Sequence, residues 1–192
     1  MRLIVGLGNP GEAYACTRHN VGVMVLQRAA VRWSIGLSVA GHLRQGHGRI
    51  GKEKIILAQP LVWMNQNGPV IKGLLQEYGL SPLDLIVVHD DLDLAAGRLR
   101  IKRHGGSGGH NGIFSLLTAL ESDQFYRLKV GIGRPAAGQE TADYVLTPFM
   151  SDEWASIALA LDQAVLALES LILDGVDVAM NRFHMKNQQT RE

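Results

Sequence analysis

The sequence has little of what stabilises small secreted proteins or anchors a protein in a membrane. Cys16 is the one cysteine among 192 residues, so the chain can form neither an internal disulfide nor a multi-cysteine metal site. The longest apolar stretch, residues 155–173, is interrupted by Asp162 and Glu169 and falls short of the roughly 18 to 20 uncharged residues that a membrane span needs. The chain begins directly with strand-like residues 3–5, so we expect no cleaved leader. These absences predict a cytoplasmic protein that is not bound to a membrane.

Net charge is also nearly absent, at +1, and this figure alone indicates no polyanionic partner. The basic residues are unevenly distributed, however. Residues 98–134 carry a net charge of +5, and the rest of the chain carries −4. A charge concentrated on one part of a domain attracts an anionic ligand even when the total is near zero. The segment is therefore either a surface for a polyanion or a solvated strand face.

The composition is that of an ordinary globular domain, 46% hydrophobic and 19% charged, which can bury about 70% of its unfolded surface. Apolar runs typical of strands alternate with segments of helical periodicity. We expect strands at residues 2–8, 48–51, 54–58, 85–88, 98–102 and 126–132, and helices at 21–33, 69–78, 113–121 and after Ser151, the last with Asp152 and Glu153 in its first turn. This alternation predicts one α/β domain over residues 1–186, with a twisted, mixed and mostly parallel sheet flanked by helices and a polar tail at 187–192.

Residues 6–11, Gly-Leu-Gly-Asn-Pro-Gly, follow the first strand and match the glycine fingerprint of dinucleotide-binding folds. That fingerprint needs a helix that opens at these glycines and an acidic residue about 20 positions further on. Here the helix begins only near Asn20, and no Asp or Glu occurs between Glu12 and Glu53. We therefore reject a nicotinamide-dependent enzyme.

Three polar loop clusters and one carboxylate supply the residue types of general-base hydrolysis. The clusters are Asn9-Pro10-Gly11 with Arg18-His19-Asn20, then Trp63-Met64-Asn65, then Gly108-Gly109-His110-Asn111-Gly112. Asp90 comes just past the strand at 85–88, where open α/β sheets place their sites. Imidazole can take a proton from water, a carboxylate can hold its tautomer, and amides can bind a carbonyl oxygen. Each residue taken singly also has a structural explanation as a cap or turn former.

Together these segments resemble the bacterial peptidyl-tRNA hydrolases. The resemblance rests on residues 3–11, 14–22, 64–65, 89–94 and 108–112, which occur in order and without large insertions between Arg2 and about His184. It implies a monomeric α/β enzyme that cleaves the ester between a peptide and the 3′ ribose of tRNA without a metal or other cofactor. Such an enzyme releases tRNA from abandoned peptidyl-tRNA.

The resemblance also implies a role for each matching residue. His19 would activate water, Asp90 would keep the imidazole basic, and Asn9 would sense that the amino group is acylated. The residues implied to bind substrate or to shape the cleft are Tyr14, Trp63, Met64, Asn65, His110 and Asn111. Arg103 and Lys129 would clamp the 5′ phosphate of tRNA, in the reverse of the Lys-then-Arg order that is more usual in the family. The implied partner is therefore the acceptor end of peptidyl-tRNA, with its 3′ CCA and its 5′ phosphate.

Three competing functions remain open from the residues alone. Cys16 could be a nucleophile with His19 as its partner, although the family more often has a small residue such as alanine at position 16. Asp90, Asp91 and Asp93 could hold a metal for phosphoester hydrolysis, although neighbouring acids on a strand point to alternate faces. The chain could also be a non-catalytic module that binds tRNA or the ribosome on the same fold.

Overall fold

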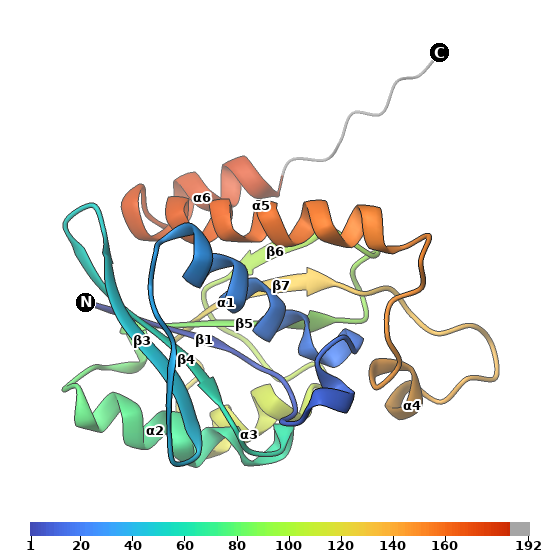
Figure 1. The fold of residues 1–192 in the computed structure, drawn as a ribbon, viewed down its shortest axis with the longest axis horizontal. Helices are drawn as coiled ribbons and strands as arrows, with labels where there is room; N and C mark the ends of the chain where they lie inside the picture. Colours follow the sequence, from blue (N-terminus) through green and yellow to red (C-terminus); the bar gives the residue numbers. More distant parts are fainter. Residues whose placement is uncertain (185–192) are drawn as a thin grey trace.

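The computed structural model describes residues 1–184, in which a seven-stranded mixed sheet lies between two layers of helices (Figure 1). The strand order is β2-β3-β4-β1-β5-β7-β6. The strands are β1 (Arg2–Gly6), β2 (Ser38–Ala40), β3 (Leu43–Ile50), β4 (Glu53–Pro60), β5 (Leu85–Asp91), β6 (Leu99–Lys102) and β7 (Tyr126–Gly131). The helices are α1 (Val21–Arg32), α2 (Asn67–Glu77), α3 (Asn111–Leu120), α4 (Thr141–Val145), α5 (Trp154–Leu173) and α6 (Val176–Phe183). The predicted α/β class is confirmed, and the predicted tail at 187–192 lies outside the described residues.

The sheet is parallel at its centre and antiparallel at both edges. Strands β4, β1, β5 and β7 are mutually parallel, whereas β2, β3 and β6 run against their neighbours. The links at 41–42 and 51–52 are too short for the crossover that parallel neighbours need, so β2, β3 and β4 form two hairpins. The predicted mixed sheet is confirmed, but its antiparallel share is larger than the sequence indicated.

The sheet separates two apolar clusters, and this fixes where the end of β5 points. Val88 packs in the cluster shared with α1 and α5, whereas Val87 packs in the cluster shared with α2 and α3. Side chains alternate along a strand. Asp90 therefore continues the row of Val88 on the α1 side, and His89 continues the row of Val87. Figure 1 shows that β1, β5 and β7 all end toward α4.

Helix α1 approaches the sheet more closely than side chains would allow. A Cβ on Gly22 would lie 2.2 Å from the carbonyl oxygen of Val88, and a Cβ on Gly6 would lie 2.4 Å from the carbonyl oxygen of Gly22. Helix α1 begins at Val21 rather than at the glycines of residues 6–11. These two glycines therefore serve close packing of helix on strand, which brings the turn before α1 to the end of β5.

Helix α5 passes the length and composition test for a membrane span, with a mean hydropathy of 1.7 over its most apolar window. Half of that window is buried inside the protein, in the cluster shared with α1 and the sheet. Helix α5 is thus a core helix of this domain. It begins at Trp154, so Asp152 and Glu153, which were predicted to lie in its first turn, precede it instead.

Candidate active site

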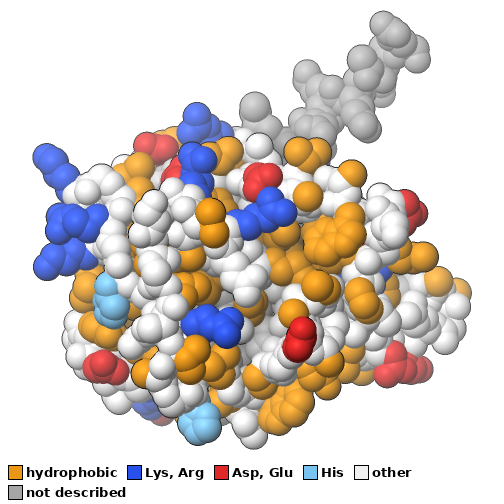
Figure 2. Space-filling view, viewed as in Figure 1, with side chains coloured by type: hydrophobic (Ala, Val, Ile, Leu, Met, Phe, Trp, Pro, Cys, Tyr) orange, Lys and Arg blue, Asp and Glu red, His pale blue; other side chains and the backbone are white. Residues whose placement is uncertain are grey.

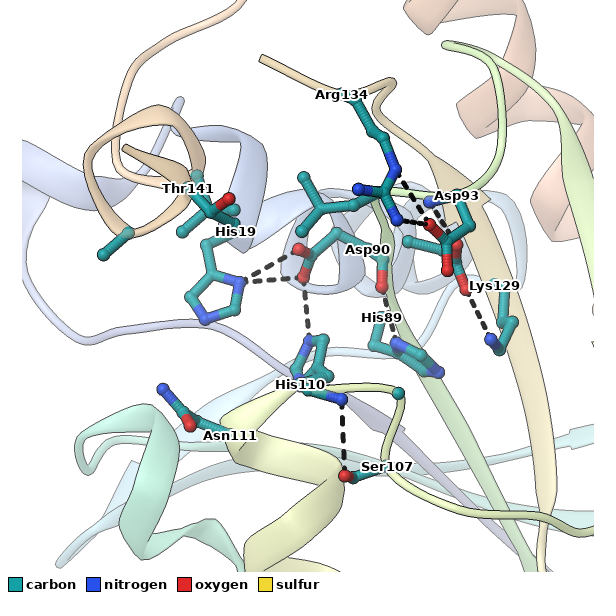
Figure 3. Close-up of a pocket in the computed structure, with 16 residues that line it drawn as sticks. His19, His89, Asp90, Asp93, Ser107, His110, Asn111, Lys129, Arg134 and Thr141 are labelled. Carbon is teal, nitrogen blue, oxygen red and sulfur yellow. Dashed lines mark hydrogen bonds and ion pairs between the residues drawn. The ribbon is translucent and has the colours of Figure 1, made fainter. Parts of the chain in front are cut away.

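The carboxyl ends of the central strands bring His19, Asp90 and His110 together (Figure 3). Strand β5 runs on to Asp91, so Asp90 lies within the strand rather than just beyond it as predicted. His19 belongs to a short 3-10 helix, Arg18–Asn20, that leads directly into α1. His110 is the residue that caps the N-terminus of α3. The three side chains are 9%, 3% and 8% exposed, respectively, so the group is nearly closed to bulk water.

The Asp90 carboxylate is the centre of this group. Nδ1 of His19 lies 2.9 Å from Oδ1 and 3.0 Å from Oδ2 of Asp90, and Nε2 of His110 lies 2.9 Å from Oδ1. Burial alone raises the pKa of Asp90, but the electrostatic attraction and hydrogen bonds of the His110 and His19 rings outweigh burial and hold this pKa far below its ordinary value. Asp90 is therefore ionised at neutral pH and acts as a hydrogen-bond acceptor.

The cap of α3 determines the tautomer of His110. Its Nδ1 accepts hydrogen bonds from the backbone N–H of Gly112 at 3.1 Å and of Ile113 at 3.2 Å. A neutral imidazole carries its proton on the other nitrogen, so Nε2 of His110 donates to Asp90. His110 therefore provides a hydrogen-bond acceptor for backbone N–H groups at the start of α3 and a donor for one oxygen of the Asp90 carboxylate.

The tautomer of His19 follows from the same acceptor. With Asp90 ionised, Nδ1 of His19 donates to it, and Nε2 is left with a free lone pair. Figure 3 shows Nε2 turned away from Asp90, toward the side of the cavity where Asn111 lies. A histidine held in this way can accept a proton from a water molecule bound beside it.

His89 packs beneath the group and is fully desolvated. Its Nδ1 donates to the carbonyl oxygen of Asp90 at 2.6 Å, and its ring lies edge-on to His110 with 4.7 Å between centroids. Burial keeps the pKa of His89 well below its ordinary value. The ring is thus neutral, and its Nε2 has no hydrogen-bond partner among residues 1–184.

Asn9 is fixed by contacts that leave one half of its amide available. Its backbone N–H donates to Oδ1 of Asn20 at 2.8 Å, and Nδ2 of Asn20 donates back to the carbonyl of Asn9 at 2.9 Å. The side-chain Oδ1 of Asn9 accepts from the backbone N–H of Met64 at 2.9 Å. The Nδ2 group is therefore the part of Asn9 that can donate to a ligand. Sequence reasoning placed Asn20 in the loop cluster without finding this bracing role.

His19 stands between two hollows of the surface. One is a cavity of about 430 Å³ that includes His89, Asp90, Asp91, Ser107, His110, Asn111, Lys129 and Arg134. The other, of about 280 Å³, includes Asn9, Trp63, Met64, Asn65, Asn111 and Leu146. His19, Asn111 and residues of α4 line both. Tyr14 lies behind Trp63 in an edge-to-face contact at 5.7 Å. Helix α4, which the sequence did not predict, is thus a wall shared by the two hollows.

Arg18 anchors the turn that holds His19. Its guanidinium is buried, donates to Oε2 of Glu153 at 2.6 Å and to Oγ1 of Thr147 at 2.7 Å, and lies 4.4 Å from the ring centre of Tyr144. These partners belong to α4 and to the segment between α4 and α5. Arg18 therefore ties the histidine turn to the same wall that lines the two hollows.

The three acids at the end of β5 do not converge on one point. Asp90 binds the two histidines, Asp91 pairs with Lys129, and Asp93 pairs with Arg134. Each carboxylate therefore has its own basic partner, and the neighbours Asp90 and Asp91 diverge as strand alternation predicts. His19, Asp90 and His110 together could offer three ligand atoms to a metal, but Nε2 of His110 carries the proton that its capping role requires. The geometry thus favours a hydrogen-bonded group over a metal site at these three residues.

Arg103 and Lys129, expected to form a phosphate clamp, have different partners on opposite faces of the sheet. Lys129 pairs with Asp91 and lines the larger cavity, whereas Arg103 pairs with Asp177 of α6. Side chains two positions apart on a strand point to the same face. Arg103 therefore points to the same side of the sheet as buried Ile101, which is the side covered by α5 and α6. The structure does not bring Arg103 and Lys129 together.

Arg100 and Lys102 share the face of Lys129 instead. In the β6–β7 ladder, Arg100 is the direct partner of Lys129, and Lys102 is the partner of Arg127. Cross-strand partners project from the same face of a sheet. Among residues 1–184, neither Arg100 nor Lys102 has a carboxylate partner within 4.0 Å. The alternation of basic and apolar residues at 98–102 was the sequence signal for this face.

The remaining predicted residue, Cys16, is exposed and forms no bond with His19, whose Nδ1 is taken by Asp90. A nucleophilic cysteine needs a base in contact with its sulfur. The structure therefore gives no support to a thiol mechanism.

A buried carboxylate in contact with a histidine beside a cleft, at the carboxyl ends of parallel strands, is typical of α/β enzymes that use general-base chemistry, such as hydrolases. Comparison with known proteins makes the assignment specific. The peptidyl-tRNA hydrolase family profile matches residues 3–191. The chain is 44% identical to the peptidyl-tRNA hydrolase of Alkaliphilus metalliredigens over 185 residues, which is 96% of this chain and 100% of the relative. It is 46% identical to that of Dehalococcoides mccartyi over 188 residues, with the same two coverages.

Solved structures agree with the sequence relatives. The crystal structure of peptidyl-tRNA hydrolase from Acinetobacter baumannii superimposes with a TM-score of 0.90 at 34% identity, covering 95% of this chain and 94% of that one. The chain belongs to the peptidyl-tRNA hydrolase family, and it is an ester hydrolase that acts on peptidyl-tRNA.

Proposed function

We propose that this enzyme cleaves the ester between the peptide and the 3′ ribose of tRNA with His19 as general base and Asp90 as its orienting carboxylate. The observation that supports this most is the contact of Nδ1 of His19 with both oxygens of Asp90, at 2.9 and 3.0 Å. That contact leaves Nε2 as the free basic atom at the junction of two hollows. One hollow would receive the peptide and the other the nucleotide end.

The reaction proceeds in two steps. Nε2 of His19 takes a proton from water as the water oxygen bonds to the ester carbonyl carbon, and the resulting imidazolium is stabilised by the negative charge of Asp90. The amide of Asn111, which lines both hollows, donates to the carbonyl oxygen as charge develops there. The bond from carbon to the ribose oxygen then breaks, and the proton passes from His19 to that oxygen.

Asn9 selects for an acylated amino group, and Asn65, which lines the same hollow, holds the peptide backbone or the terminal adenosine. Nδ2 of Asn9 is the free donor beside the smaller hollow, because its Oδ1 is held by Met64. A blocked amino group presents a carbonyl acceptor to this donor, whereas a free ammonium offers only hydrogen-bond donors. Trp63 forms the aromatic side of the same hollow, where the peptide backbone would lie, and Tyr14 packs edge-on against Trp63.

The tRNA acceptor end lies along the basic face of β6 and β7 in this proposal. Lys129 stands in the larger cavity, and Arg100 and Lys102 extend the same face away from it. Phosphate contacts of this kind give affinity without sequence preference. The 5′ phosphate is thus assigned to Lys129 with Arg100 and Lys102, and Arg103 is left to its pair with Asp177.

The proposed enzyme works as a monomer and needs no metal. His19, Asp90, Asn9 and Asn111 all come from one copy of the chain, and the protonated Nε2 of His110 leaves no lone pair for a cation. Because the substrate is a product of translation, we place the enzyme in the cytoplasm.

The direct test is incubation with N-acetyl-aminoacyl-tRNA and, in parallel, with unblocked aminoacyl-tRNA of the same tRNA. The proposal predicts fast release of the blocked amino acid, no comparable release of the free one, and the same rates in the presence of a chelator. Equal cleavage of both substrates contradicts the role of Asn9. No cleavage of either, with binding retained, favours a non-catalytic tRNA-binding module.

A further inference from the structure

Phe114 is an aromatic side chain that is largely exposed to solvent. It is 63% exposed, although it lies in the first turn of α3 beside buried Ile113. It stands three residues after Asn111, which lines both hollows around His19. That spacing places the two side chains on one face of the helix, about 4.5 Å apart along its axis. The catalytic site and Phe114 therefore share one exposed edge of α3.

The rest of α3 shows in which direction this edge faces. Ser115 and Ala119 face α2, because a Cβ on Gly68 would lie 2.1 Å from the Ser115 carbonyl and 2.8 Å from Cβ of Ala119. Leu117 lies on the opposite side of the helix, and Phe114 lies about 60° from Leu117 around the helix axis, on the solvent-exposed side. Helix α2 lies toward β4 in the sheet order, so the side away from α2 is that of β7 and β6.

The neighbouring face of β6 and β7 carries positive charge. Arg100 and Lys102 are exposed there. The ammonium of Lys102 lies against Gly105, in the loop that leads into α3. Arg127, its ladder partner, donates to the carbonyl of Gly106 in that same loop at 2.6 Å. The basic side chains of β6 and β7 thus contact the loop that leads into α3, the helix that carries Phe114.

Positive groups that track a phosphate backbone, next to an aromatic ring that can accept a base, are what single-stranded nucleic acid binding requires. We infer that Phe114 stacks on the base of an unpaired nucleotide at the 3′ end of the tRNA, beside the basic face of β6 and β7 that holds the acceptor end. This inference rests on the proposed function, because the ester at His19 places that unpaired strand within one or two nucleotides of Asn111. Through this stacking, Phe114 binds the flat face of a base near the ester and does not distinguish one base from another.

The test compares Phe114 variants on N-acetyl-aminoacyl-tRNA and on versions with one abasic nucleotide at each unpaired 3′ position in turn. One stacked base contributes about 1–3 kcal/mol, so Phe114→Ala should raise KM about 5- to 160-fold with kcat kept. Phe114→Trp should keep the parent KM, and Phe114→Leu, which is apolar without a π face, should behave like the alanine variant. One abasic position should raise the parent's KM and abolish the difference between the parent and Phe114→Ala.

Leu159→Ala is the matched control, because Leu159 is 68% exposed on α5. It belongs to the opposite side of the sheet, where Figure 2 shows apolar side chains interspersed with Lys and Arg. This variant should leave KM unchanged. A parent-like KM for Phe114→Leu, or a KM defect that no abasic position removes, overturns the stacking. Should the parent hydrolyse the blocked substrate while Phe114→Ala keeps its KM, stacking fails and the proposed function stands. Failure of the parent itself on that substrate contradicts the proposed function.

Discussion

His110 donates from Nε2 to Oδ1 of Asp90 at 2.9 Å, on the same oxygen that Nδ1 of His19 approaches to 2.9 Å. Its other ring nitrogen accepts from the first backbone N–H groups of α3. One side chain therefore couples the start of a helix to the carboxylate that orients the proposed base. Sequence comparison placed His110 among the substrate-binding residues, and the geometry assigns it a positioning role.

Two substitutions of His110 separate its roles. Both His110→Asn and His110→Ala remove the hydrogen bond to Asp90, so both should lower kcat with little change in KM. Asparagine caps a helix and alanine does not, so the alanine variant should be less stable than the asparagine variant by about 0.5–2 kcal/mol. Denaturant unfolding and steady-state kinetics measure the two effects. Parent-like kcat in both variants would show that Asp90 does not depend on His110.

His89 predicts a loss of stability in mild acid. Its pKa in the folded protein lies well below the ordinary value of 6.5 because the ring is buried. As pH falls below about 6.5, the unfolded chain binds a proton at His89 that the folded chain does not, and the free energy of unfolding decreases. Asp90, whose folded pKa is also lowered, adds a further loss only below about pH 4. The His89→Gln variant should show a shallower decrease in Tm between pH 7 and 5 than the parent. An identical pH dependence in both proteins would contradict the neutral, buried ring.

The basic face of β6 and β7 predicts a change in salt dependence. Each phosphate contact contributes about −0.7 to −0.9 to the slope of log K against log salt. The Arg100→Ala, Lys102→Ala double variant should therefore raise KM for full-length substrate and flatten that slope by roughly 1.4 to 1.8 units, with kcat kept. Arg103→Ala is the control, since Arg103 pairs with Asp177 on the other face, and it should retain the parent slope. If Arg103→Ala changed the salt slope more than the double variant did, that result would support the clamp of Arg103 and Lys129 that the sequence predicted.

Cys16 is expected to be dispensable. It is exposed, and His19 is committed to Asp90 rather than to the thiol. The Cys16→Ser variant should therefore keep parent kcat and KM and should resist thiol alkylation. Loss of turnover in the serine variant would indicate a thiol nucleophile.

Much of the architecture follows from apolar periodicity and turn residues. Helix α1, strand β7 and the β3–β4 hairpin occur where the sequence predicts them, with longer hairpin strands. The antiparallel edge was less visible because β2 has only three residues, all of them exposed. Helix α4 has five residues, too few for a periodic signal to develop. These short elements are defined by tertiary contacts, such as the anchoring of the adjacent segment by Arg18, and not by local pattern.

The sequence predicted which residue types form the site, but not which side chains contact one another. The residue types around His19 and Asp90 indicated general-base chemistry, and strand alternation indicated that the acids of 90–93 would diverge. No local pattern could show that His110 binds Asp90, because the two side chains meet only when α3 docks beside β5. Nor could adjacency in the sequence separate Lys102 from Arg103. The separation follows from the faces of β6, which only the pairing with β7 defines.

The central claim is that His19, held by Asp90, activates water. It is tested most directly by single-turnover hydrolysis of N-acetyl-aminoacyl-tRNA by His19→Ala and Asp90→Asn, with tRNA affinity measured in parallel. We predict that His19→Ala lowers the rate about 10²- to 10⁴-fold, that Asp90→Asn lowers it by a smaller but clear factor because the imidazole survives without its orienting charge, and that both bind tRNA within a few-fold of the parent. Rates within a few-fold of the parent for both variants would contradict the assignment of His19 as the base.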